Sequence, residues 1–352
     1  MRIVRFAVPA AIAAATIAGC SQPTDAPTAS GSGTPPDTEV TVVTHDSFAV
    51  PDAVVAQFES DTGIAVTFVA PGDAGTLTNQ LILTKDAPVG DVAYGVDNTF
   101  ASRALEEGVF ADYVSAAPAQ QDAATYAIDG SSALTAIDYS DVCLNYDLAY
   151  FADNGLAVPQ TFDDLLKPEY KGLLSVANPA TSSPGLAFLL ATIAAKGEGW
   201  QDYWTELAAN DLRVTSSWSD TYYTDFSAPN YGGDFPLVLS YASSPPFEVV
   251  DGEATTAALL DTCFRQVEYA GVLTGAKHPQ AAQKVIDWML SDDFQAALPE
   301  NMYVYPVSTS VDVPEDWATY APLSAKPWSV PADEIDANRE AWLTEWTAVV
   351  NP

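Results

Sequence analysis

Apolar positions along the chain follow two alternating spacings. Short β-branched runs at residues 40–44 and 64–69 are typical of strands, and the segment between them, 51–60, places its apolar residues at helical spacing. Further strands are expected at residues 91–97, 173–176, 212–215 and 236–241, and further helices from Thr76, Thr99 and Thr161, over 186–195 and around 200–207. Strands that alternate with helices predict an α/β fold with a mostly parallel sheet, in which ligands bind at the carboxyl ends of strands.

Two longer strand-like stretches interrupt this alternation. Residues 133–146 and 264–272 each suit a connection that crosses between two lobes. After the second stretch, helices are expected from Pro279, from Ser291 and around Trp342, where apolar residues return at helical spacing. The pattern therefore predicts two lobes joined by crossover hinge strands, with a ligand cleft between the lobes.

The first twenty residues are typical of a targeting segment. A short basic start is followed by an apolar run over residues 6–17 that is too short to span a membrane, and small residues lead into Cys20. This segment resembles a bacterial lipoprotein signal peptide, which implies cleavage before Cys20 and a lipid on its sulfur, outside the cytoplasmic membrane. The alternative is a plain secretory signal with an incidental cysteine. Residues 21–38, rich in Ser, Thr, Pro, Gly and Asp, predict a flexible tether.

Export would place the two remaining cysteines, Cys143 and Cys263, in an oxidising compartment. They can either pair or remain buried thiols, and we favour a pair. Each is expected to open a crossover strand, so that a disulfide would join the two hinge strands side by side. A metal site is not expected, because neither cysteine has a Cys or His at ligand spacing and the chain holds only His45 and His278.

Composition excludes several partners. The chain has 352 residues and a hydrophobic share of 48%, enough for two folded domains. Its 13 Lys and Arg against 47 Asp and Glu, a formal charge of -34, would repel nucleic acids and anionic membranes. Neutral or cationic ligands are compatible with this charge.

Catalytic motifs are not recognisable. The chain contains no phosphate-binding loop, no dinucleotide fingerprint and no nucleophile motif. An exported two-lobed protein of this kind is expected to be a solute receptor that closes over a ligand, with no reaction and no cofactor. The alternative of a different class is an exported hydrolase that uses Ser183 or Ser243, for which the sequence offers no evident base.

Two segments of the second lobe mix aromatic rings with small hydroxyls. Residues 217–223 (SWSDTYY) and 239–245 (LSYASSP) suit two walls of one pocket, because rings supply stacking area and hydroxyls orient a small ligand. The alternative is that Trp218 and Tyr241 are core residues and the serines are helix caps. Composition does not separate these readings.

Six segments in order resemble one known family. They are THDSF from Thr44, GVDN from Gly95, TSSPGLAFLLATIA from Thr181, SWSDTYY from Ser217, LVLSYASSP from Leu237 and NMYVYPV from Asn301. Together they are similar to the thiamine-binding substrate-binding proteins of ABC transporters, over about residues 40–310. The resemblance implies a two-lobe periplasmic-binding-protein fold of the class II type that captures thiamine or its phosphates and delivers them to a permease. We expect a monomer. We expect one lobe at 39–140 and 268–306 and the other at 141–267 and 307–352.

The resemblance also implies a set of ligand-binding residues. The rings that match family positions around the ligand are those of Trp218, Tyr222, Tyr241 and Tyr303. Tyr303 departs from the family pattern, since relatives can carry Trp there. The family's ligand needs aromatic faces, carboxylates and hydroxyls, because thiamine carries a thiazolium cation, an aminopyrimidine and a hydroxyethyl tail.

Polar roles can be assigned on the same basis. Asp46 and Asp97 could accept hydrogen bonds from the amino group or offset the cation, although loop capping is an alternative for both. Ser182 and Ser183, at a helix start, suit the hydroxyl or phosphate end, although N-capping is the alternative. Ser243 could add a hydrogen bond beside Tyr241.

A second binding reading comes from the same superfamily. The adjacent Tyr222 and Tyr223 resemble the iron-coordinating pair of ferric-ion receptors, and His45 with Asp46 could complete an oxygen-rich site. Trp218 and Tyr241 suit an organic ligand better than a bare ion.

Overall fold

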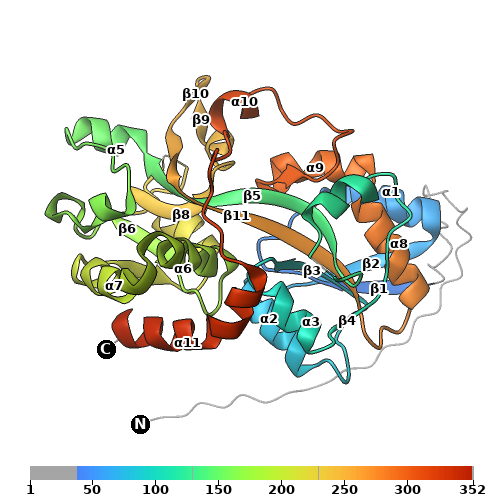
Figure 1. Cartoon of the computed structure of the whole chain (residues 1–352). Coiled ribbons are helices and arrows are strands. Elements are labelled where there is room, and N and C mark those ends of the chain that lie inside the picture. Colours follow the sequence, from blue (N-terminus) through green and yellow to red (C-terminus); the bar gives the residue numbers. More distant parts are fainter. Residues whose placement is uncertain (1–37, 129, 229, 351–352) are drawn as a thin grey trace, which may run out of the picture. The chain divides into compact units, whose positions relative to one another are not determined.

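The structure is a computed structural model that describes residues 38–128, 130–228 and 230–350 (Figure 1). The predicted signal peptide, Cys20 and the tether up to residue 37 lie outside these residues, and Thr38 already begins the first strand. Within the described part, no helix is both long and apolar enough to cross a membrane.

The strands of the described residues form one mixed sheet of ten and a separate pair. They are β1 Thr38–Val43, β2 Ile64–Val69, β3 Val92–Asp97, β4 Phe110–Ala111, β5 Thr135–Asp147, β6 Leu174–Ala177, β7 Arg213–Thr215, β8 Leu237–Tyr241, β9 Val249–Val250, β10 Glu253–Ala254, β11 Thr256–Leu273 and β12 Tyr305–Pro306. The large sheet runs in the order β2-β1-β3-β11-β5-β8-β6-β7, with β12 beside β5 and β4 beside β11, while β9 and β10 pair separately.

Pairing direction divides this sheet into two halves. The β1, β2 and β3 strands pair in parallel, and so do β6, β7 and β8. Between these halves run the two long strands β5 and β11, which are antiparallel to each other and to their outer neighbours. We call the part built on β1 to β3 the first lobe and the part built on β6 to β8 the second lobe. The two-lobed α/β prediction with crossover strands is confirmed.

Helices cover the sheet in both lobes (Figure 1). The α-helices are α1 Asp52–Thr62, α2 Ala74–Leu83, α3 Ala101–Glu106, α4 Gln120–Ala123, α5 Leu148–Asp153, α6 Ser183–Lys196, α7 Trp200–Ala209, α8 Pro279–Met289, α9 Asp292–Met302, α10 Trp317–Tyr320 and α11 Ala332–Val350. Shorter turns are η1 Ala124–Tyr126, η2 Phe162–Leu166, η3 Pro168–Tyr170, η4 Gly197–Gly199, the π-helix η5 Asp220–Asp225 and η6 Pro245–Glu248.

Helix α6 shows how the sequence pattern becomes packing. It is apolar on every side, and its residues from Ser183 to Ile193 are buried against β11, β5 and β8. A helix without a polar face is stable only inside a core. Its first turn lies so close to the end of β6 that a Cβ on Gly185 would be 2.5 Å from the carbonyl oxygen of Ala177, so that only glycine fits there.

The two hinge strands are joined by a disulfide between Cys143 and Cys263, as predicted. The expected positions of these cysteines within the strands were wrong, because both lie inside their strands instead of opening them. Strand β11 begins at Thr256, and its pairing with β5 shifts between Leu259 and Phe264, where it holds extra residues. The sequence reading missed this because the four consecutive apolar residues 257–260 do not alternate with polar residues as in a half-buried strand.

Two local predictions also need correction. Thr99 does not cap α3, whose N-cap is Phe100; its backbone and hydroxyl instead donate to Asp97. Thr161 does cap a helical segment, with a reciprocal bond to Asp164, but this segment is the short 3-10 turn η2.

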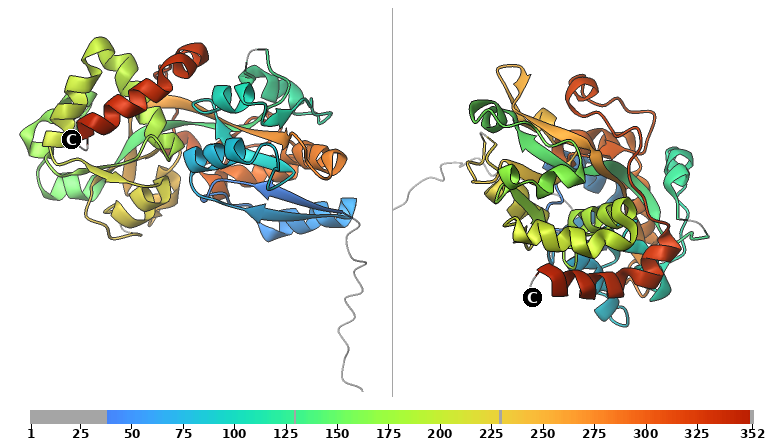
Figure 2. Two further views of the ribbon diagram at one scale, coloured as in Figure 1. Left: turned by 90° about the horizontal axis from the view of Figure 1, so that it is seen from below. Right: turned by 60° about the vertical axis from the view of Figure 1, so that its left-hand side comes forward.

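The C-terminal helix α11 contacts both lobes (Figure 1 and Figure 2). Arg339 lies over the ring of Phe100, next to α3, with its guanidinium carbon 5.7 Å from the ring centroid. Further along the helix, the rings of Trp346 and Trp204 of α7 meet edge to face, with 5.6 Å between their centroids. The residue boundaries given above for the lobes remain a prediction.

Candidate functional site

Aromatic rings from both lobes meet beside the hinge. We call the following six residues the aromatic cluster: Trp218, Tyr222, Tyr223, Tyr231, Phe247 and Tyr303. Trp218 and Tyr222 stack with a centroid distance of 5.2 Å and an interplanar angle of 12°. Tyr303, at the end of α9 in the first lobe, meets Trp218 edge to face at 6.1 Å. The centroid of the Tyr241 ring lies 5.8 Å from that of Trp218, so that the four predicted rings are brought together.

The short π-helix η5 aligns the rings of the second lobe. Residues four apart in a helical turn lie on one face, and Trp218, Tyr222 and Phe226 follow that spacing, with Tyr222 and Phe226 at 5.6 Å. The Ser217 hydroxyl accepts from the Asp220 amide at 3.1 Å and so closes the start of the turn. This geometry also separates the adjacent tyrosines, because Tyr222 is fully buried whereas Tyr223 is 41% exposed.

Tyr303 reaches the cluster through an unusual backbone conformation. Its φ of 59° is left-handed, a region that costs a non-glycine residue about 1 kcal/mol or more. The Ser243 hydroxyl of the second lobe donates to the Tyr303 carbonyl and also pairs with the Ser140 hydroxyl at 2.7 Å. The predicted residue Ser243 thus holds Tyr303 in place by its backbone.

Asp97 and Ser183 meet directly across the lobes. The buried Ser183 hydroxyl, in the first turn of α6, donates to the Asp97 carboxylate at the end of β3. Thr99 adds a backbone bond of 3.0 Å to Asp97, and the Gln266 amide donates to Ser183 at 3.1 Å. Burial raises the pKa of Asp97, while the bonds from Ser183 and Thr99 oppose that rise.

The other predicted polar residues have different surroundings. Ser182 is the N-cap of α6, since its hydroxyl accepts from the Gly185 amide at 3.4 Å, so that the capping alternative holds for it. Asp46 is exposed after β1, and partial burial is the main cause that raises the pKa of its carboxyl. Burial, followed by the charge of Glu268, raises the pKa of Tyr241 well above its usual range.

Asp73 is a site residue that the sequence reading missed. It caps α2 by accepting from the Ala74 amide at 2.6 Å, and its other oxygen accepts from the Trp218 amide of the second lobe at 2.9 Å. Burial raises the pKa of Asp73 to about 6, against the opposing bond from Trp218. A helix-capping aspartate carries no sequence signal of a partner 145 residues away.

The backbones of the two lobes are also in direct contact beside Asp73. The amide of Gly75 in α2 donates to the carbonyl oxygen of Thr181, before α6, at 3.0 Å. A Cβ on Gly75 would lie 2.8 Å from the Thr181 carbonyl carbon, so that a larger residue would separate the two helix starts.

A buried polar group at the hinge strands was also missed. The Tyr94 hydroxyl donates to Asp138 at 2.5 Å and lies 3.4 Å from Glu268. His45 Nε2 lies 3.4 Å from Glu268, a distance that would suit an ion pair. Burial lowers the pKa of His45 to about 4, so that the imidazole is neutral at neutral pH and this contact is not an ion pair.

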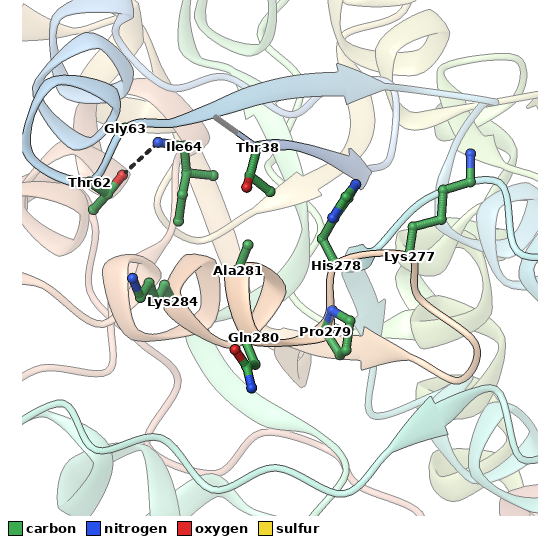
Figure 3. Close-up of a pocket in the computed structure, with 10 residues that line it drawn as sticks. All are labelled: Thr38, Thr62, Gly63, Ile64, Lys277, His278, Pro279, Gln280, Ala281 and Lys284. Carbon is green, nitrogen blue, oxygen red and sulfur yellow. Dashed lines mark hydrogen bonds between the residues drawn. The ribbon is translucent and has the colours of Figure 1, made fainter. Parts of the chain in front are cut away.

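Five cavities of the described residues lie away from these side chains, and none of the five is lined by a predicted site residue or by the aromatic cluster. A cavity of about 450 Å³ lies between the starts of β1, β2 and α8 (Figure 3). Lys277, His278 and Lys284 line it, and no Phe, Tyr or Trp ring and no predicted site residue does. Its lysines would repel a cationic ligand, which favours the aromatic cluster as the ligand site.

Comparison with known proteins agrees with the fold and the motifs. The family model for bacterial extracellular solute-binding proteins matches residues 87–330. The thiamine-binding periplasmic protein of Escherichia coli K12 is 30% identical over 324 residues, covering 89% of this chain and 93% of that protein. A solved periplasmic thiamin binding protein is 29% identical, with a TM-score of 0.77, and the match covers 89% of this chain and 96% of that one.

Ferric-ion receptors share the architecture. Iron-bound HitA from Pseudomonas aeruginosa matches with a TM-score of 0.70 at 21% identity, covering 89% of this chain and 99% of that one. At this identity the likeness concerns the fold alone.

The buried hinge carboxyls predict a dependence of stability on pH. Burial raises the pKa of Asp138 and Glu268 above that of the unfolded chain, so that the folded state holds more protons and the free energy of unfolding falls as pH rises from about 4. Asp138→Asn should flatten this fall, by about 1.4 kcal/mol for each pKa unit removed. Denaturant unfolding at pH 5 and pH 8 measures it.

Asp312→Asn serves as the control for this measurement, because Asp312 is exposed and its loss changes only the overall charge. The slope with pH should change in the Asp138 variant and not in the Asp312 variant. Equal slopes in all three proteins would contradict the assignment of a proton to the buried pair.

Proposed function

The chain belongs to the bacterial extracellular solute-binding protein family, and from this we propose that it captures thiamine or a thiamine phosphate for an ABC importer. The ligand would bind between the lobes and pass to the permease subunits of that importer. The relatives described above are periplasmic, so that we place this receptor on the outer side of the cytoplasmic membrane.

The aromatic cluster is the observation that carries this proposal. Thiamine joins a thiazolium cation to an aminopyrimidine, and a cation over aromatic faces gains about 1 to 2 kcal/mol where water is excluded. Trp218 and Tyr222 supply stacked faces, and Tyr303 approaches them from the other lobe. Asp73 and Asp97 lie at the same junction and suit a ligand that is positively charged and donates hydrogen bonds.

Binding would exchange contacts between the lobes for contacts to the ligand. Tyr303 contacts Trp218 directly, and Ser183 donates to Asp97. Opening about the hinge strands β5 and β11 would separate these pairs, and closing on thiamine would replace ring–ring contacts by ring–ligand contacts. Ser183 would then be able to donate to the ligand's hydroxyl or phosphate end.

The tyrosine pair favours an organic ligand over ferric ion. Iron coordination needs deprotonated phenols, but burial raises the pKa of both Tyr222 and Tyr223, and the protonated Tyr222 hydroxyl donates a hydrogen bond to Glu248 at 3.0 Å. Among the described residues, no three His, Cys, Asp or Glu side chains gather as a metal site. The pair therefore supports stacking instead of metal binding.

We propose no reaction and no cofactor for this chain. Ser183 and Ser243, the serines of the hydrolase alternative, have carboxylate, amide, hydroxyl and carbonyl partners in the structure and no histidine among them. Neither serine therefore has the Ser–His arrangement that activates a hydrolase nucleophile, and the carboxylate bonded to Ser183 is that of Asp97, to which Thr99 also donates. We further propose that the receptor acts as a monomer, with a lipid on Cys20 as its membrane anchor.

Trp218→Ala should weaken thiamine binding by about 2 to 4 kcal/mol, because it removes the largest stacking face of a buried aromatic anchor. Calorimetry of the purified chain with thiamine measures this, and quenching of tryptophan fluorescence reports the same event. Trp342→Ala, on the half-buried face of α11, is the control and should bind as the parent does. The proposal fails if the parent gives no binding heat with thiamine, thiamine monophosphate or thiamine diphosphate.

Lipid attachment at Cys20 predicts that the chain, expressed in a bacterium, incorporates labelled fatty acid and sediments with membranes. Cys20→Ser should lose the label and the sedimentation, whereas Cys143→Ser should keep both. A parent protein that carries no label would rule out the anchor.

A further inference from the structure

Glu248 is a buried acidic residue directly behind the aromatic cluster. It ends the short turn η6, one residue after Phe247, and its side chain is 0% exposed. Oε1 accepts from the Tyr222 hydroxyl at 3.0 Å, and Oε2 accepts from the Asn230 amide at 2.7 Å. Both oxygens act as acceptors, which is the hydrogen-bonding pattern of an ionised carboxylate.

This carboxylate has no positive partner in the described part of the chain. The ion pairs there involve other acidic residues, and none includes Glu248. Burying a charge without a counter-charge costs several kcal/mol, which two hydrogen bonds offset only in part. Glu248 is one of 47 acidic residues in the chain, and a fully buried carboxylate does not contribute to solubility.

The charge of Glu248 affects the pKa of four tyrosines in the aromatic cluster. After burial, which is the largest cause, its charge contributes to raising the pKa of Tyr222, Tyr231, Tyr223 and Tyr303. These four rings contact one another or Trp218, with centroid distances of 5.2 to 6.1 Å. A negative charge behind electron-rich ring faces strengthens the attraction of those faces for a cation.

From this arrangement we propose that Glu248 is the charge-selecting residue of the site: through Tyr222 and the aromatic cluster it favours the cationic ring of the ligand over a neutral ring of the same shape. The inference rests on the proposed function and adds the position of the thiazolium ring, which lies at the aromatic cluster. Glu248 acts through the rings, so that it is a positioning residue and needs no direct contact with the ligand. Asp73 and Asp97 are then left for the polar groups of the ligand at the start of α6.

The test compares two ligands of one shape. Thiamine carries the cationic thiazolium, and 3-deazathiamine replaces the quaternary nitrogen by carbon, which makes the ring neutral. The full chain, purified in detergent, should bind thiamine at least about tenfold more tightly than 3-deazathiamine in calorimetry at low ionic strength, on the scale of one screened charge–charge interaction.

Glu248→Gln keeps the size of the side chain and an oxygen that accepts from Tyr222, but removes the charge. It should reduce the preference for thiamine about tenfold, mainly by weakening thiamine. A purely structural role would weaken both ligands alike and leave the ratio unchanged. Glu253→Gln removes an exposed acid from the neighbouring strand β10 and should leave both affinities unchanged.

Each outcome decides one of the two claims. An unchanged ratio in Glu248→Gln, with thiamine still bound by the parent, overturns the role of Glu248 and leaves the proposed function standing. Equal affinity of the parent for both ligands overturns it as well, even if the variant fails to fold. A parent that binds neither ligand overturns the proposed function itself.

Discussion

The antiparallel pairing of β5 and β11 is the interaction on which the rest of the structure depends. These two long strands are the only path of the large sheet between its parallel halves in the described residues, and the Cys143–Cys263 disulfide joins them covalently. Each strand supplies residues to both lobes, so that their pairing sets where the start of α2 meets the start of α6. The aromatic cluster, Asp97 and Ser183 come together because of that register.

The second constraint is the placement of negative charge. The chain has few cations, and its buried acids near the hinge are stabilised by hydrogen bonds from hydroxyls and amides more than by ion pairs. The hydroxyl of Tyr94 donates to Asp138, that of Ser183 to Asp97, and that of Tyr222 to Glu248. Such an interior leaves electrostatic attraction available to the cationic ring of a ligand. It also keeps the phenols of the cluster protonated, which suits stacking.

The sequence predicted best those features that depend on residues close together along the chain. Periodicity located most helices and strands. The disulfide could be predicted because the chain was expected to be exported and has only two cysteines besides Cys20. The rings of Trp218 and Tyr222 could be grouped because they lie in one short segment of aromatic and hydroxyl residues, SWSDTYY. Asp73 and Glu248 could not be found, because their partners lie far along the chain or across the lobes, and a carboxylate that caps a helix or follows a turn has an ordinary local explanation. The bulge in β11 was missed for the same reason, since it depends on what lies opposite.

The central claim is that the chain holds thiamine between rings of both lobes. A crystal structure of the chain grown with thiamine tests this most directly. We predict the thiazolium ring stacked among Trp218, Tyr222 and Tyr303, with Asp73 or Asp97 in hydrogen-bond contact with the aminopyrimidine. Thiamine bound elsewhere, for example in the lysine-lined cavity beside α8, with the aromatic cluster still closed on itself, would contradict the account.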